Sequence, residues 1–139
     1  MRRATLDTNV NAAGLNFRGV AFRLLEAAKD GAFAMQLSRP ILEETVRILQ
    51  KRFQWDEARA RNAGALLSSF SQAVTPRVEL DVIKRDPDDN RILECAQASG
   101  SDYIVTWDKE LLDLQRYAGA DMIPPQRFLS ILSQQGRGI

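Results

Sequence analysis

The segment Tyr103-Ile104-Val105-Thr106-Trp107-Asp108 combines a short apolar strand with an acidic residue just past its end. A strand this apolar is typical of the middle of a parallel sheet, where both faces are buried. The segment Ala4-Thr5-Leu6-Asp7, near the start of the chain, follows the same pattern. In open parallel sheets ligands bind outside the carboxyl ends of the strands. The two segments therefore predict a sheet whose binding edge carries carboxylates.

Helices and strands alternate along the rest of the chain. Ser38 occupies an N-cap position, and Pro40 falls in the first turn of the helix that follows, where proline is tolerated. We expect further helices at 18–29, 56–71, 89–98, 109–114 and 125–133, strands at 32–37 and 121–123, the latter at the sheet edge, and a weakly extended segment at 78–83. This alternation predicts an α/β fold, a three-layer α/β/α sandwich around a central, mostly parallel sheet.

The size and the hydropathy of the chain predict one domain that is not inserted in a membrane. The 139 residues are enough to bury a hydrophobic core, and we expect a single domain over 1–139 with a frayed tail at 134–139. The start of the chain lacks the apolar region of a secretory signal, and no apolar run approaches the roughly 20 residues of a membrane span. We therefore expect a cytoplasmic protein.

Composition excludes several kinds of chemistry. The chain has no histidine and a single cysteine, Cys95, so neither a Ser-His-Asp nor a Cys-His arrangement can form, and a zinc site of Cys and His is excluded as well. The net charge of +1 gives no global basic field of the kind that many nucleic-acid binders carry. Carboxylate chemistry remains, and it suits hard divalent cations.

Four acidic residues, far apart in the sequence, each lie near the end of a predicted element. Asp7 follows the first strand, Glu44 lies in the helix after the second strand, Asp89 begins a helix, and Asp108 follows the strand quoted above. All four can meet at one edge of the sheet, where their mutual repulsion would be severe without a cation between them. The pattern predicts a carboxylate site for Mg²⁺ or Mn²⁺.

Each of these acids also has a purely structural interpretation. Asp7 could belong to a turn, Asp108 could cap the following helix, and one of the acids in Asp86-Pro87-Asp88-Asp89 is expected to cap the helix that starts there. Glu43 and Glu44 could both complement a helix dipole, although a helical wheel places Glu44 nearer the apolar stripe. No single position is specific, whereas the joint pattern is.

Together these motifs resemble the PIN-domain family. Leu6-Asp7-Thr8-Asn9-Val10, the Ser-x-x-Ile-x-x-Glu pattern from Ser38 to Glu44, Asp86-Pro87-Asp88-Asp89-Asn90 and the Ile-Val-Thr-x-Asp pattern ending at Asp108 occur in the family's order, over most of the chain. The sequence is most similar to VapC-like toxins of toxin–antitoxin pairs. The resemblance implies a Mg²⁺- or Mn²⁺-dependent ribonuclease with RNA as substrate, a possible cognate antitoxin protein and a homodimer.

The resemblance also assigns roles to individual residues. Asp7, Glu44, Asp89 and Asp108 match the acidic quartet of the family. Asn9 would support Asp7, and Thr106 matches the small polar residue near the metal or the scissile phosphate. Trp107 departs from the family pattern, in which many relatives have Gly; its ring could stack a base, narrow the site or serve local packing.

Three arginines near the predicted edge, Arg18, Arg85 and Arg91, could hold substrate phosphates. The dimer has indirect support in the helices between Pro40 and Ser71, whose apolar residues exceed what one small sheet can cover, unless the two helices pack on each other. These apolar residues are Leu49, Phe53, Trp55, Leu66, Leu67 and Phe70.

Other functions fit the sequence less well. A phosphohydrolase of the haloacid-dehalogenase kind needs Asp-x-Asp-x-Thr after the first strand, but this chain has Asp7-Thr8-Asn9 there and lacks the second acid. A phospho-receiver domain needs a Lys-Pro pair after a late strand, which is absent. A catalytically silent PIN module that binds RNA or a protein remains the alternative, although such a module has no use for four mutually repelling acids.

Overall fold

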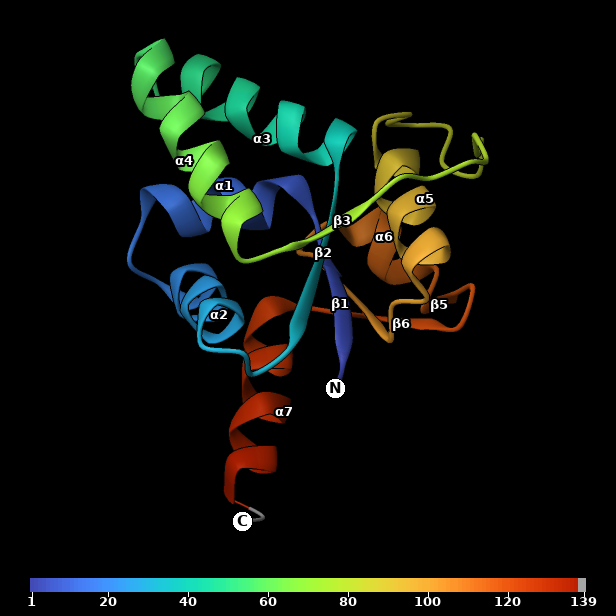
Figure 1. Cartoon of the computed structure of the whole chain (residues 1–139). Helices are drawn as coiled ribbons and strands as arrows, with labels where there is room; N and C mark the ends of the chain where they lie inside the picture. The colour runs from blue at the N-terminus through green and yellow to red at the C-terminus, as the bar shows by residue number, and fades with distance from the viewer. Residues whose placement is uncertain (138–139) are drawn as a thin grey trace.

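A six-stranded sheet forms the centre of the computed structural model, which describes residues 1–137 (Figure 1). The strand order is β3-β2-β1-β4-β6-β5, and every neighbouring pair is parallel except β5 and β6. The strands are β1 (Arg3–Leu6), β2 (Ala34–Ser38), β3 (Gln72–Val74), β4 (Tyr103–Val105), β5 (Arg116–Tyr117) and β6 (Ala120–Ile123). The predicted three-layer α/β/α fold with a mostly parallel sheet is confirmed.

Helices cover both faces of the sheet. They are α1 (Thr8–Asn16), α2 (Val20–Lys29), α3 (Arg39–Lys51), α4 (Glu57–Ser69), α5 (Asp89–Ser99), α6 (Lys109–Asp113) and α7 (Pro125–Arg137). Figure 1 shows α1, α2 and α7 on one side of the sheet and α5 and α6 on the other, while α3 and α4 pack together beyond its upper end. Because all strands except β5 run in the same direction, their carboxyl ends lie at one edge of the sheet.

The two strands that end in acids are the central neighbours of the sheet. Leu6 of β1 pairs with Val105 of β4, both are fully buried, and the Asp7 N–H donates to the Val105 carbonyl (2.9 Å). Burial on both faces explains why the last residue of each strand before its acid, Leu6 and Val105, is apolar. This pairing fixes the backbones before Asp7 and Asp108 side by side, as the sequence pattern requires.

Helix α1 was not expected from the sequence. Its residues include three Asn and one Gly, poor helix formers, and show no amphipathic period. Packing compensates, because α1 contacts both α2 and α3. At Gly14 an added Cβ would lie 2.6 Å from Leu25 Cδ1, so the glycine permits the close approach of α1 and α2.

Several predicted strands differ from those observed. Residues 78–83 form no strand; the third strand is β3, whose Gln72 Oε1 accepts a hydrogen bond from Gln36 Nε2 (2.8 Å). The segment 121–123 is not at the edge, because β5 lies outside β6 and joins it through a tight turn at Ala118 and Gly119, both with positive φ. Polar and two-residue strands carry no hydropathy pattern, which explains both errors.

The C-terminal helix is longer than expected. Helix α7 continues to Arg137 rather than ending at Ser133, so residues 134–137 are helical and not a frayed tail. The last two residues of that predicted tail, 138–139, lie outside the described residues. Within residues 1–137 no helix has both the length and the apolar character to cross a bilayer.

Candidate active site

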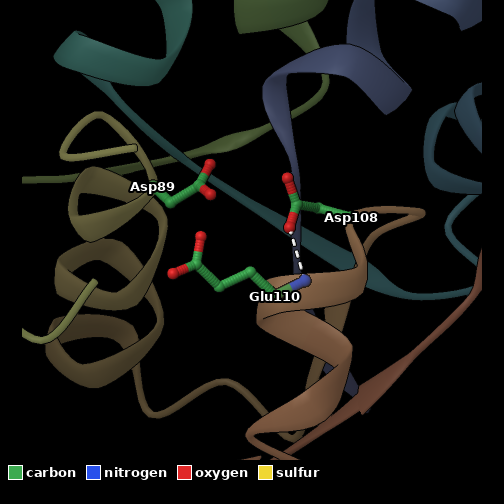
Figure 2. A group of neighbouring side chains, drawn as sticks. All are labelled: Asp89, Asp108 and Glu110. Carbon is green, nitrogen blue, oxygen red and sulfur yellow. Dashed lines mark hydrogen bonds between the residues drawn. The ribbon is translucent and has the colours of Figure 1, made fainter. Parts of the chain in front are cut away.

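Three carboxylates from two helices meet at the carboxyl-terminal edge of the sheet. Asp89 lies at the start of α5, Asp108 precedes α6, and Glu110 lies in the first turn of α6. Oxygen atoms of the three side chains lie within 4.8 Å of one another, and Figure 2 shows the carboxylates gathered between the two helices. We call these three residues the acidic centre.

Asp108 has a structural and a potential ligating role at once. Its Oδ1 accepts hydrogen bonds from the N–H groups of Glu110 (2.8 Å) and Leu111 (3.2 Å), so the predicted helix cap is confirmed (Figure 2). Its Oδ2 accepts no hydrogen bond from a described residue. One oxygen therefore holds α6 in place while the other remains available to a ligand.

Asp89 is not used as a cap. The N–H groups of Asp89, Asn90 and Arg91 donate to the backbone carbonyls of Asp86, Pro87 and Asp88, respectively. The predicted side-chain cap is not made by the N-cap residue, Asp88, but Asp86 Oδ1 accepts the N–H of Asp88 (3.3 Å) where the chain enters α5. The backbone turn satisfies the donors instead. Asp89 is 93% buried, and its Oδ2 has no hydrogen-bond partner within the described chain.

Asp7 is tied to the acidic centre through Thr106. The buried Thr106 hydroxyl donates to Asp7 Oδ2 (2.7 Å) and accepts the N–H of Asp108 (2.9 Å). One side chain thus fixes both the carboxylate that follows β1 and the backbone that follows β4. Thr106 lies where the family resemblance places a small polar residue, and its observed contacts are those of a positioning residue.

The acids strongly perturb one another. Burial raises the pKa of Asp7, the hydrogen bond from Thr106 lowers it, and the charge of Asp108 raises it again. Burial raises the pKa of Asp89 to about 7, and the charges of Asp7 and Asp108 add to the effect, with smaller contributions from Asp86 and Glu110. The ionised cluster is therefore costly on its own, which is characteristic of functional sites.

The residues of the acidic centre fit a small divalent cation. Mg²⁺ and Mn²⁺ prefer carboxylate oxygens, and each of the three side chains offers one oxygen within 4.8 Å of the other two. A buried carboxylate oxygen without a partner, such as Asp89 Oδ2, costs free energy unless something outside the chain satisfies it. The unsatisfied oxygen and the mutual repulsion would both be relieved by a cation between Asp89, Asp108 and Glu110.

Glu44 lies apart from the acidic centre. It lines a cavity of about 170 Å³ together with Thr8, Asp88 and Arg91, and its carboxylate forms an ion pair with Arg47. Its side chain is 28% exposed, against 56% for Glu43. Glu44 thus faces the same edge of the sheet as the acidic centre, but in the structure its charge is already neutralised.

The predicted supporting residues have mixed placements. The exposed Asn9 side chain accepts a hydrogen bond from Arg52 (3.3 Å), whereas the backbone N–H of Asn9 donates to the Asp7 carboxylate and lowers its pKa. Asn9 thus supports Asp7 through its backbone and not through its side chain. Arg91 shares the cavity of Glu44, but its guanidinium pairs with Glu94 (2.9 Å). Of the other two predicted phosphate ligands, Arg18 stacks on Phe22, and Arg85 is solvent-exposed next to Asp86, so its role stays a prediction.

Glu110 is the site residue that the sequence analysis missed. A signal for it exists in hindsight. Once Asp108 is taken as the N-cap of α6, Glu110 falls in the first turn, where acidic residues complement the helix dipole and lie beside the cap. That position brings its carboxylate to the edge of the sheet that Asp108 occupies.

Comparisons with known proteins agree with this geometry. The sequence matches the family model for the PIN domain over residues 3–110. The fold is similar to that of PAE2754 from Pyrobaculum aerophilum, with a TM-score of 0.62 and 18% sequence identity over 96% of this chain and 90% of that one. No curated protein matches the chain. Because the family match covers most of the sequence and includes all four predicted acids, this chain belongs to the PIN-domain family.

Proposed function

We propose that this protein is a metal-dependent ribonuclease that hydrolyses RNA phosphodiester bonds with Mg²⁺ or Mn²⁺. PIN domains are generally nucleases, and the acidic cluster expected of such an enzyme is present. The observation that carries the metal dependence is the buried Asp89 Oδ2, which has no partner in the described chain and belongs to a group of three carboxylates. Burying such a group without a ligand would be unfavourable.

Each residue of the site has a separate role in this proposal. Asp89, Asp108 and Glu110 would hold the cation, and Asp7 would add its negative charge beside them. Thr106 keeps Asp7 and the backbone of Asp108 in register through its two hydrogen bonds. When bound, the cation lowers the pKa of water and neutralises charge on the attacked phosphate. No protein nucleophile is needed, which suits a chain without histidine.

Glu44 is proposed to orient the attacking water or to complete the ligand set. It lines the cavity that also contains Thr8, the residue after Asp7. Its ion pair with Arg47 would have to open for this role, and the partial exposure of both side chains makes the pair weak. The same ion pair favours the alternative, a catalytically silent PIN module that binds RNA or a protein.

The biological setting is proposed from the resemblance to VapC-like toxins. In that setting the protein would be the toxin of a toxin–antitoxin pair, with a cognate antitoxin protein as inhibitor, and would act in the cytoplasm as a homodimer. The structure weakens one argument for the dimer, because Leu49 and Leu67 are fully buried within the chain. Of the six apolar residues cited for the interface, Leu66 remains well exposed.

Cleavage of RNA by the purified protein tests the proposal. RNA is incubated with Mn²⁺ or with EDTA, using the wild type and the Asp7→Asn and Asp108→Asn variants, and Glu43→Gln serves as an exposed-acid control. We expect cleavage only with metal, a loss of several orders of magnitude in both Asn variants, and an unchanged rate in the control. Undiminished cleavage by both Asn variants, with contamination excluded, would sink the proposal. Metal-independent binding of RNA without cleavage would support the silent module.

A further inference from the structure

Trp107 separates two residues of the site and is largely exposed. Thr106 before it is fully buried and bound to Asp7, and Asp108 after it belongs to the acidic centre, yet 45% of Trp107 is accessible to solvent. Trp is a residue that burial usually favours. The indole is therefore exposed at the carboxyl-terminal edge of the sheet, one residue along the chain from Asp108, where a substrate of the acidic centre would pass.

The position of the ring is fixed by hydrogen bonds and not by packing in the core. The Thr106 N–H donates to the Ile123 carbonyl (3.0 Å), and the Asp108 N–H donates to the Thr106 hydroxyl, so the backbone is held on both sides. The indole N–H donates to Oε1 of the exposed Gln126 (3.3 Å). The ring is thus oriented before any ligand binds, which reduces the entropy lost on binding.

The other tryptophan of the chain provides a contrast. The Trp55 ring is covered by the Arg59 guanidinium at 3.7 Å, and its indole N–H donates to Asn16 (2.9 Å). Among the described residues, none places an aromatic ring or a guanidinium on Trp107. Trp55 serves the structure of the chain, whereas the π-faces of Trp107 have no such partner.

Two cations flank this ring in the sequence. Lys109 follows Asp108, and Arg127 follows Gln126; both are exposed, and neither forms an ion pair with a described residue. Exposed cations beside an aromatic ring are the combination that binds single-stranded nucleic acids, because the ring stacks a base while the cations neutralise phosphates. With a net charge of only +1, a local arrangement of this kind matters more than the global field.

We propose that Trp107 stacks an unpaired nucleobase of single-stranded RNA next to the acidic centre, and so sets the substrate class of the enzyme. This inference rests on the ribonuclease function proposed above. The base would belong to a nucleotide beside the cleaved bond, because Trp107 is the residue adjacent to Asp108. Every base has a π-face, so the contact selects for unpaired structure and not for sequence. A duplex keeps its bases stacked internally and would not be bound in this way.

Binding measured without cleavage tests the inference. Single-stranded oligo(A) is titrated in EDTA against the wild type, Trp107→Ala, Trp107→Phe and Phe17→Ala. The last variant is the matched control: Phe17 is also an exposed aromatic residue, but it follows the far end of α1, roughly 14 Å along that helix from Asp7. We expect Kd to rise roughly 5- to 150-fold for Trp107→Ala, which is the usual effect of removing a stacking ring, and to change little for Trp107→Phe and the control.

Fluorescence provides a readout that does not depend on the alanine variant. In a Trp55→Phe background Trp107 is the only tryptophan, since the chain has two. We expect oligo(A) to quench its emission and poly(A)·poly(U) duplex to leave it unchanged. An unaltered Kd for Trp107→Ala, emission that does not change at saturating oligo(A), or equal quenching by the duplex would each overturn the inference.

The outcomes separate this inference from the ribonuclease function. Metal-dependent cleavage with an unchanged KM in Trp107→Ala would overturn the stacking role while leaving the nuclease intact. Quenching and weakened binding in a protein that cleaves no RNA with any metal would support the stacking role and refute the nuclease.

Discussion

The charge of Asp89 should destabilise the metal-free protein, so Asp89→Asn should make it more stable. The neutral amide has almost the shape of the carboxylate, and Asp89 Oδ2 accepts no hydrogen bond in the described chain that the change would remove. The new amide hydrogens would face the carboxylates of Asp108 and Glu110. Repulsion is thus replaced by attraction.

The magnitude follows from the pKa of Asp89, which rises from 3.8 to about 7 on folding. Because the folded pKa is the higher one, folding is favoured by protonation, and this stability is lost as the pH rises from about 4 through about 7. At about 1.4 kcal/mol per pKa unit the full shift corresponds to about 4 kcal/mol. Burial is the larger cause of the shift and the neighbouring charges the smaller, and water at the open edge of the site weakens both, so we use half of this value, about 2 kcal/mol.

Thermal unfolding at two pH values measures this effect. At pH ~8 in EDTA we expect Asp89→Asn to melt about 6 °C above the wild type, since about 1 kcal/mol shifts Tm by about 3 °C in a chain of this size. Near pH ~4 Asp89 is protonated in the folded wild type and partly protonated in the unfolded chain. The gain in the free energy of unfolding from Asp89→Asn should therefore fall to about 0.3 kcal/mol. Asp88→Asn, a change at the exposed neighbouring residue, is the control. An Asp89→Asn variant that is less stable at high pH, or equally stabilised at both, would refute the reasoning.

Three further predictions concern other residues. Thr106→Val should lower the free energy of unfolding by about 1–3 kcal/mol, because two buried hydrogen bonds are lost. It should also raise the pKa of Asp7 and move the acid limb of the pH–rate profile to higher pH, and Thr106→Ser should restore the stability and the profile. An unmoved profile would argue against the positioning role. Glu110→Gln should weaken Mn²⁺ binding at least about tenfold in calorimetry, Glu43→Gln should leave it unchanged, and equal affinities would remove Glu110 from the ligand set. Light scattering should give twice the monomer mass of 15.6 kDa, and Leu66→Arg should reduce it; a wild-type mass of one chain would exclude the dimer.

The sequence was most informative where burial dictates residue type. The apolar strand before Asp108 was expected in the middle of the sheet, and the rule that ligands bind at the carboxyl ends of parallel strands placed the acids at one edge. That β1 and β4 are direct neighbours was shown only by the structure. The cap at Ser38 was also predictable, and its hydroxyl accepts a hydrogen bond from Ile41 N–H (3.4 Å). These features depend on local chemistry or on a hydrophobic pattern, both of which are visible in a sequence.

Features stabilised by tertiary contacts were not predictable. Helix α1 has poor intrinsic propensity and forms because it packs against α2 and α3. Strand β3 is held by main-chain pairing to β2 and by the side-chain contact of Gln72, without an apolar pattern. Glu110 was missed although the start of α6 was predicted correctly, because its place beside Asp89 depends on where the separate helix α5 lies, and no local pattern in the sequence shows that.

The central claim is that Asp89, Asp108 and Glu110 bind a divalent cation. The most direct test is the anomalous scattering of manganese in crystals grown or soaked with Mn²⁺, compared between the wild type and Asp108→Asn. We predict one or two strong anomalous peaks between these carboxylates in the wild type, within about 2–2.5 Å of their oxygens, and no peak there in Asp108→Asn. Wild-type crystals that contain Mn²⁺ elsewhere but show no peak between Asp89, Asp108 and Glu110 would contradict the claim.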